Sequence, residues 1–214
     1  MAYFPLVGLL IGISAAVVHF LLSYVLAPQV CDLVAIAFMV IVTGNMHGDG
    51  LMDTADGIYS GRPRERILEI MRDSCVGSHG VMAGVLVLLA KFVLLGQLPP
   101  EVKQFALILT PAMGRWAQVY GATVYPYART GGGTGGFTDH VGRREIFWAS
   151  LTALAAAVLL FGLWGGILAG AVLVGTAAIG RYIAAKIGGM TGDTLGAMSE
   201  MTEVLSLFVV QFLF

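Results

Sequence analysis

Long apolar runs are the feature that most constrains the fold of this 214-residue chain. A helix needs about 20 mostly apolar residues to cross the hydrocarbon of a bilayer. The sequence has seven such runs, near residues 4–26, 30–46, 77–97, 102–124, 145–163, 165–186 and 194–213. Hydrophobic residues make up 57% of the chain and charged residues 12%, whereas soluble domains average about 45–50% and about 25%. The sequence therefore predicts an all-α, polytopic membrane helix bundle, with residues 1–214 as a single transmembrane domain.

The first two runs carry separate expectations. The first lacks a basic leader and a small-residue cleavage site, so we expect it to be retained as a helix and not removed as a signal peptide. The second passes directly into Asn45, His47 and Asp49. We expect one continuous helix from about 31 to 60, which carries these polar residues just past the membrane edge.

Basic residues predict the orientation of the bundle. Of the 12 Lys and Arg residues, nine lie in the connections after the second and fourth runs or at the end of the sixth: Arg62, Arg64, Arg66, Arg72, Arg129, Arg143, Arg144, Arg181 and Lys186. The positive-inside rule assigns these connections to the cytoplasm, with the N-terminus inside. Cys31 and Cys75 then fall on opposite sides and are not expected to pair. A net charge of −1 provides no basic face for a nucleic acid.

Three aspartates in the polar stretch 44–80 predict a metal site. Asp49, Asp53 and Asp56 are spaced i, i+4 and i+7, and a helix would hold them within roughly 60° of arc. Their oxygens suit Mg²⁺, which usually binds one or two carboxylates and completes its shell with water and substrate phosphates. The alternative is a solvated acidic face. Because carboxylates near a membrane are costly and usually functional, we favour the metal site.

The connection that follows offers positive charge for an anionic substrate. Four arginines lie in it: Arg62, Arg64, Arg66 and Arg72. Residues 62–73 also place Ile67, Ile70 and Met71 on one side of a short amphipathic helix for the interface, with a solvated connector as the alternative. Carboxylates beside arginines at a membrane indicate metal-dependent handling of a phosphate ester.

Other polar segments are predicted on the same cytoplasmic face. His79, between the glycines of the segment 77–80, could contact a phosphate or be structural. The glycine-rich segment 128–140 is interpreted as a mobile cap over the substrate, or else a plain linker. Asp193 and Thr194 begin a helix whose free N–H groups could bind an anion, although a plain N-cap is the commoner use of such a residue.

The last run also contains acidic residues inside the membrane. Glu200 lies on nearly the same helical face as Asp193, about 10 Å deeper. Neither Glu200 nor Glu203 is expected to face lipid, and one of them is a candidate partner for Arg115.

Three motifs occur in order along the chain: HGDGLMDTADG at 47–57, LEIMRDS at 68–74 followed by Gly77 and His79-Gly80, and TGDTLGA at 191–197. They resemble the motifs of the cobalamin synthase family, the adenosylcobinamide-GDP ribazoletransferases, and the likeness extends from residue 3 to the C-terminus. The chain differs from the usual family pattern at Gly48, where Leu is common, and at Cys75, where a basic residue is frequent. Members of the family usually carry a further N-terminal stretch before the region that corresponds to residues 4–8 here.

The resemblance implies a Mg²⁺-dependent enzyme of vitamin B12 biosynthesis in the inner membrane. The basic residues predict that the active site of this single catalytic domain faces the cytoplasm. The enzyme would transfer the adenosylcobinamide-phosphate group from adenosylcobinamide-GDP to α-ribazole or its 5′-phosphate, releasing GMP. The products would be adenosylcobalamin or its 5′-phosphate. Besides these substrates and the lipid bilayer, a homo-oligomer and other cobalamin-pathway enzymes are conceivable partners.

On this interpretation each candidate site residue has an expected role. The metal ligands are Asp49, Asp53, Asp56 and Asp193, and either Asp53 or Asp56 acts as the general base. The substrate-binding residues are His47, Arg62, Arg72, Asp73, His79, Thr191, Asp193 and Thr194.

Two other functions compete with this one. A CDP-alcohol phosphotransferase uses clustered aspartates for similar chemistry, and residues 53–57 begin its motif, but Ser60-Gly61 stand where that family has Ala-Arg. A cation or metabolite transporter could use Glu200, Glu203 and Arg115 as an intramembrane relay. Transporters often show internal repeats, which this sequence lacks.

Overall fold

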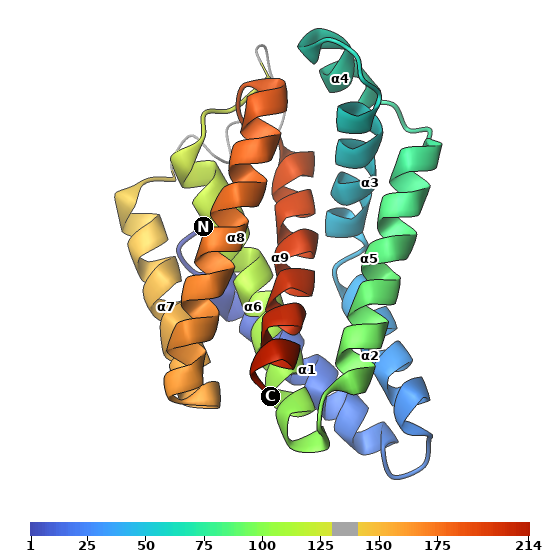
Figure 1. The fold of residues 1–214 in the computed structure, drawn as a ribbon, viewed down its shortest axis with the longest axis vertical. Coiled ribbons are helices and arrows are strands. Elements are labelled where there is room, and N and C mark those ends of the chain that lie inside the picture. Colours follow the sequence, from blue (N-terminus) through green and yellow to red (C-terminus); the bar gives the residue numbers. More distant parts are fainter. Residues whose placement is uncertain (130–140) are drawn as a thin grey trace.

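The structure, a computed structural model, describes residues 1–129 and 141–214. These residues form a bundle of nine α-helices and one isolated β-bridge between Tyr127 and Met190 (Figure 1). The helices are α1 (Phe4–Leu22), α2 (Pro28–Val42), α3 (Met46–Tyr59), α4 (Arg64–Ile70), α5 (Ser78–Gln97), α6 (Pro100–Val124), α7 (Arg143–Phe161), α8 (Leu163–Ile187) and α9 (Gly192–Leu213). The predicted all-α membrane bundle is confirmed.

Each of the seven apolar runs folds as a helix, but not all of them are equally apolar. Five helices of the described chain, α1, α5, α7, α8 and α9, are long and apolar enough to cross a membrane, and the bent pair of α2 and α3 has the length and composition of either a sixth, broken span or a re-entrant loop. The remaining run forms α6, which carries Glu101, Lys103 and Arg115. Residues 109–119 of α6 are all buried, so neighbouring helices shield this part of α6 from lipid.

The second run is broken and does not continue as one helix. Between α2 and α3, Gly44 and Asn45 have φ values of 60° and 57°, and the two helices are bent by 86° relative to each other. A right-handed helix cannot pass through this left-handed backbone conformation. The expected continuous helix over 31–60 is therefore wrong. The break lets α3 lie between α5 and α9 (Figure 1).

The predicted amphipathic helix after the aspartates is confirmed as α4. Ile67 is buried against α3, whereas Arg62, Arg66 and Arg72 are exposed around it. Arg64 joins α4 to the end of α8 and to the segment after α6. Its Nε donates to the carbonyl of Ile187 at 2.7 Å, and its Nη2 donates to that of Ala128 at 2.6 Å.

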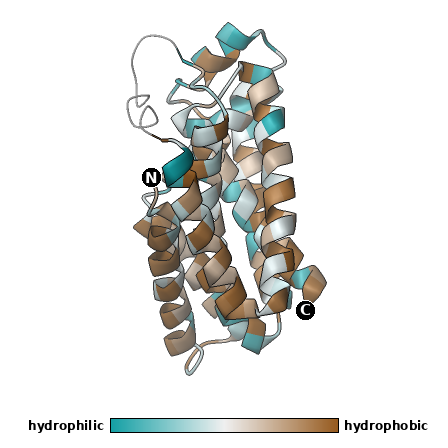
Figure 2. Cartoon of the chain, turned by 90° about the vertical axis from the view of Figure 1, so that its left-hand side faces the viewer, coloured by the Kyte–Doolittle hydropathy of each residue, from teal (hydrophilic) through white to brown (hydrophobic). Residues whose placement is uncertain are grey.

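Hydrophilic residues gather at the α4 end of the bundle, while apolar residues cover its flanks (Figure 2). Leu86 and Val93 of α5, for example, are 58% and 54% exposed, as side chains that face lipid would be. Both cysteines are free, as expected: Cys31 is buried and Cys75 is exposed.

A buried polar cluster joins α1, α2 and α6 at the end opposite α4. Lys103 Nζ donates to both carboxylate oxygens of Asp32 at 2.9 Å. His19 Nε2 lies 2.9 Å from the same carboxylate, and Gln104 Nε2 lies 2.9 Å from His19 Nδ1. The cluster satisfies polar groups that would otherwise be buried without partners, so it fixes the three helices relative to one another.

Close packing of α1 on α6 depends on two glycines. A Cβ atom at Gly8 would lie 2.5 Å from the carbonyl oxygen of Pro111, and one at Gly12 would lie 2.4 Å from that of Ile108. Small residues of this kind let membrane helices approach each other closely.

We expect Gly12→Leu to force α1 away from α6 and to lower the free energy of unfolding by about 1–3 kcal/mol or more. Gly170→Leu is the matched control, because nothing lies within 4 Å of a Cβ atom at that position of α8. Thermal melting of both variants in detergent measures the difference. Equal melting temperatures would contradict the packing role of Gly12.

Candidate active site

The structure brings the first and last polar motifs together at the α4 end of the bundle. A Cβ atom at Gly50 would lie 2.6 Å from the backbone oxygen of Asp193, so α3 meets the start of α9 in direct backbone contact. This approach requires glycine at position 50, which the sequence motif supplies. Asp49 and Asp53 on α3 therefore lie near Asp193, although 140 residues separate Asp53 from Asp193 in sequence.

Acidic side chains dominate the surroundings of Asp53 on α3. The negative charges of Asp49, Asp193 and Asp56 all act on Asp53, and Arg129 is the cation that opposes them. Arg129 Nη2 donates to Asp193 Oδ2 at 2.7 Å. Asp49 is exposed and Asp53 half-buried, and neither carboxylate has a hydrogen-bond partner within the described ranges. The cluster is thus short of positive charge.

Asp56 has a different environment from the other two aspartates of α3. Its Oδ2 accepts a hydrogen bond from Gly77 N–H at 2.7 Å, and its Oδ1 accepts one from Gly80 N–H at 2.8 Å. A Cβ atom at either glycine would come within 2.5 Å of the carboxylate, so both positions require glycine. Asp56 therefore caps the N-terminus of α5, which satisfies amides that the helix leaves free.

The start of α9 is a capping box. Thr194 N–H donates to Thr191 Oγ1 at 3.2 Å, and Thr191 N–H donates to Thr194 Oγ1 at 2.7 Å. Both threonines are fully buried. They fix the turn that presents Asp193, whose Oδ2 also accepts from Thr191 Oγ1 at 3.3 Å.

Four of the predicted substrate-binding residues lie on the exposed connection between α3 and α5 or at its end. The Arg62 and Arg72 guanidinium groups have no side-chain partner among the described residues and are free to meet an anion. Asp73 Oδ1 accepts a hydrogen bond from Cys75 N–H at 3.0 Å, which shapes the connection. The exposed ring of His79 lies 6.0 Å from that of Tyr59.

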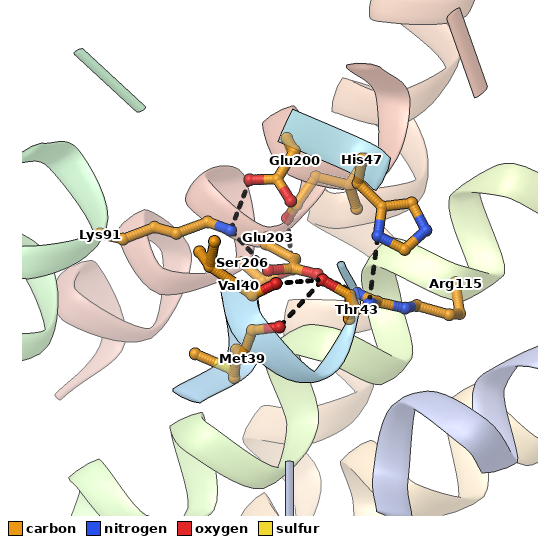
Figure 3. Close-up of polar contacts among 10 residues, drawn as sticks. Met39, Val40, Thr43, His47, Lys91, Arg115, Glu200, Glu203 and Ser206 are labelled. Carbon is orange, nitrogen blue, oxygen red and sulfur yellow. Dashed lines mark hydrogen bonds and ion pairs between the residues drawn. The ribbon is translucent and has the colours of Figure 1, made fainter. Parts of the chain in front are cut away.

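His47 is separated from the aspartates and belongs to a buried charge network (Figure 3). Arg115 Nη2 lies 3.3 Å from His47 Nδ1, and Nη1 of the same arginine is paired with Glu203. Lys91 Nζ donates to Glu203 and to Glu200, each at 2.7 Å. The predicted pairing of Arg115 with a glutamate of the last helix is confirmed, and neither glutamate faces lipid.

Sequence reasoning missed the contacts that three residues of this region make. Lys91 was detectable as a lone cation within the apolar run 77–97, which needs a buried acidic partner. The carbonyl contacts of Arg64 and the Arg129–Asp193 ion pair left no comparable signal, because they depend on tertiary approach. Most of the predicted cap, 128–140, lies outside the described residues.

The aspartates that the sequence predicts as magnesium ligands form a small donor set in the structure. In the part of the chain that the structure describes, no group of three or more His, Cys, Asp or Glu side chains is arranged to hold a metal ion. Asp49 and Asp53 nevertheless provide two carboxylates on one helical face that are without hydrogen-bond partners in residues 1–129 and 141–214. Mg²⁺ usually takes one or two protein carboxylates and fills its shell with water and substrate phosphates, so these residues fit it.

The chain matches the model of a protein family described as cobalamin-5-phosphate synthase over residues 1–211. A protein of Desulforamulus reducens named adenosylcobinamide-GDP ribazoletransferase is 43% identical over 98% of this chain and 84% of its own length. Proteins of the same name from Acetivibrio thermocellus and Clostridium acetobutylicum are each 37% identical over 98% of this chain. The matched regions span 85% and 84% of the lengths of these two proteins, respectively. No solved structure matches the chain.

The capping geometry of Asp56 predicts a loss of stability in Asp56→Ala. The substitution removes the acceptor of two backbone hydrogen bonds, so we expect the free energy of unfolding to fall by about 1–2 kcal/mol. Asp49→Ala, measured without divalent cations, is expected to stay within about 0.5 kcal/mol because Asp49 is exposed. Thermal melting in detergent compares the two variants, and an equal loss in both would show that Asp56 is not a specific cap.

Proposed function

The chain belongs to the cobalamin-5-phosphate synthase family, and from this premise we propose that it is an adenosylcobinamide-GDP ribazoletransferase. It would join the adenosylcobinamide-phosphate group to α-ribazole or its 5′-phosphate and release GMP. The observation that carries the proposal is the family match over residues 1–211, together with the named relatives. The acidic end of α3 is the part of the molecule with the chemistry that this reaction needs.

In this proposal the four carboxylates have separate roles. Asp49 and Asp53 accept no hydrogen bond from any residue that the structure describes and would hold magnesium, with Asp193 beside them. Magnesium bound there would neutralise negative charge on the diphosphate and on the GMP leaving group. Asp56 would support the site indirectly, because both of its oxygens already accept backbone hydrogen bonds.

The chain's own groups would then bind the phosphates and move one proton. The ribazole hydroxyl oxygen bonds to the phosphorus that carries the cobinamide, the bond from that phosphorus to the GMP oxygen breaks, and the hydroxyl proton passes to a carboxylate. Asp53 is better placed than Asp56 for this step, because both oxygens of Asp56 accept backbone hydrogen bonds and those of Asp53 accept none from the described residues. The exposed guanidinium groups of Arg62 and Arg72 would hold phosphate oxygens.

The aspartate end of the bundle would face the cytoplasm. Arg62, Arg66 and Arg72 surround α4, and the cytoplasmic side of a membrane protein is rich in such residues. The nucleotide-activated donor would then reach the aspartates from the side where nucleotides are made.

Purified protein in liposomes is expected to release GMP from adenosylcobinamide-GDP when α-ribazole and Mg²⁺ are present. We expect EDTA to abolish release, Asp53→Ala to lower kcat by about 100-fold or more, and Glu101→Ala at the opposite end to stay within about twofold. Absence of GMP release from the unmodified protein refutes the transferase. Release that resists EDTA, or that persists in Asp53→Ala, refutes only the metal assignment.

Cys75 provides a test of orientation, because it is exposed at the aspartate end. We expect a membrane-impermeant maleimide to label it in inside-out vesicles and not in intact spheroplasts. A Glu101→Cys variant should show the opposite pattern, and the buried Cys31 should react only after denaturation. Labelling of Cys75 in intact spheroplasts would place the aspartates outside.

A further inference from the structure

A cavity of about 420 Å³ lies inside the bundle, next to the break between α2 and α3. Its wall includes Gly48 and Met52, which are the chain neighbours of Asp49 and Asp53. It also includes Val81, which follows the Gly80 whose N–H group binds Asp56. The cavity therefore begins at the level of the candidate active site and extends into the membrane part of the protein.

The charged groups that line the cavity neutralise one another. Lys91 is paired with Glu200 and Glu203, and Arg115 is paired with Glu203 (Figure 3). Two cations and two anions leave no net charge to attract a phosphate or another ion. The ligand that this cavity suits is consequently uncharged.

Most of the remaining wall is apolar. Ile36, Met39 and Leu51 line it from α2 and α3, and Val85 and Leu88 line it from α5. Small-molecule pockets typically span about 300–1,000 Å³ and combine apolar walls with a few polar groups, as this one does. Lys91 supplies such a group, because an ammonium has three N–H donors and the glutamates occupy two of them.

We propose that this cavity binds the base of the acceptor nucleoside, an inference that rests on the transferase function proposed above. The base of ribazole is a flat, uncharged, dimethylated bicycle with one unsubstituted ring nitrogen, which can accept the remaining N–H of Lys91. The corrin macrocycle of the donor is too large for the cavity. Guanine carries several polar edge groups that the apolar wall would leave without partners.

This placement also explains the position of the cavity beside the aspartates. With the base held in the apolar part, the ribose lies toward Gly48 and Met52, and its hydroxyl groups approach Asp53. Gly84 then determines how much room the base has, because it lines the cavity next to Met52, whose Sδ would lie 3.3 Å from a Cβ atom at position 84.

Filling the cavity gives the first test. We expect Gly84→Leu to raise the KM for α-ribazole by about tenfold or more and to leave the KM for adenosylcobinamide-GDP within about twofold. The matched control is Ala83→Leu, because Ala83 lines a neighbouring cavity bounded by α3, α5, α8 and α9 and does not line the proposed one, and both KM values should stay within about twofold. An unchanged acceptor KM in Gly84→Leu, or an equal rise for the donor, would overturn the proposal.

Enlarging the cavity gives a second test, which does not depend on the folding of Gly84→Leu. We expect Met39→Ala to raise kcat/KM for a riboside of naphthimidazole, relative to that for α-ribazole, by about fivefold or more. An unchanged preference in a variant that still releases GMP overturns the cavity assignment and leaves the transferase intact. If the unmodified protein releases no GMP with either acceptor, the proposed function itself fails.

Discussion

Mutual neutralisation of charges buried at membrane depth is the interaction on which the arrangement of the bundle depends. Glu203 on α9 is paired with both Lys91 on α5 and Arg115 on α6, and Arg115 reaches His47 on α3. None of these groups is stable alone in an apolar surrounding, because an isolated buried charge costs several kcal/mol or more. The four helices are therefore fixed as a set, and the aspartates are fixed with them.

The break between α2 and α3 places the aspartates of α3 at the candidate active site. Had the second apolar run continued as one straight helix, Asp49 and Asp53 would have been carried away from the start of α9. The left-handed conformations of Gly44 and Asn45 redirect the chain, so that Gly50 contacts the backbone of Asp193. The same break leaves room for the cavity beside Gly48. One short irregular segment thus places both the acidic cluster and the apolar cavity.

The two halves of the site differ in the chemistry that they can bind. The end around Asp49, Asp53 and Asp193 is acidic and opposed by Arg129, which suits a divalent cation and phosphates. The cavity lined by Leu51 and Lys91 is neutral and mostly apolar, which suits an uncharged aromatic group. A transferase that joins a nucleotide-activated donor to a ribazole needs both environments next to each other.

The sequence by itself determined the class of the protein, the helices apart from the break between α2 and α3, the amphipathic α4 and the family. Apolar run length and the spacing of motifs are local properties, which the chain displays before it folds. Only the tertiary structure decided that Asp56 caps α5, that His47 belongs with Arg115, and that Lys91 joins α5 to α9. These roles depend on which distant segment approaches each side chain. That approach follows from helix packing and from the break at Gly44 and Asn45. The local pattern of polar and apolar residues specifies neither of them.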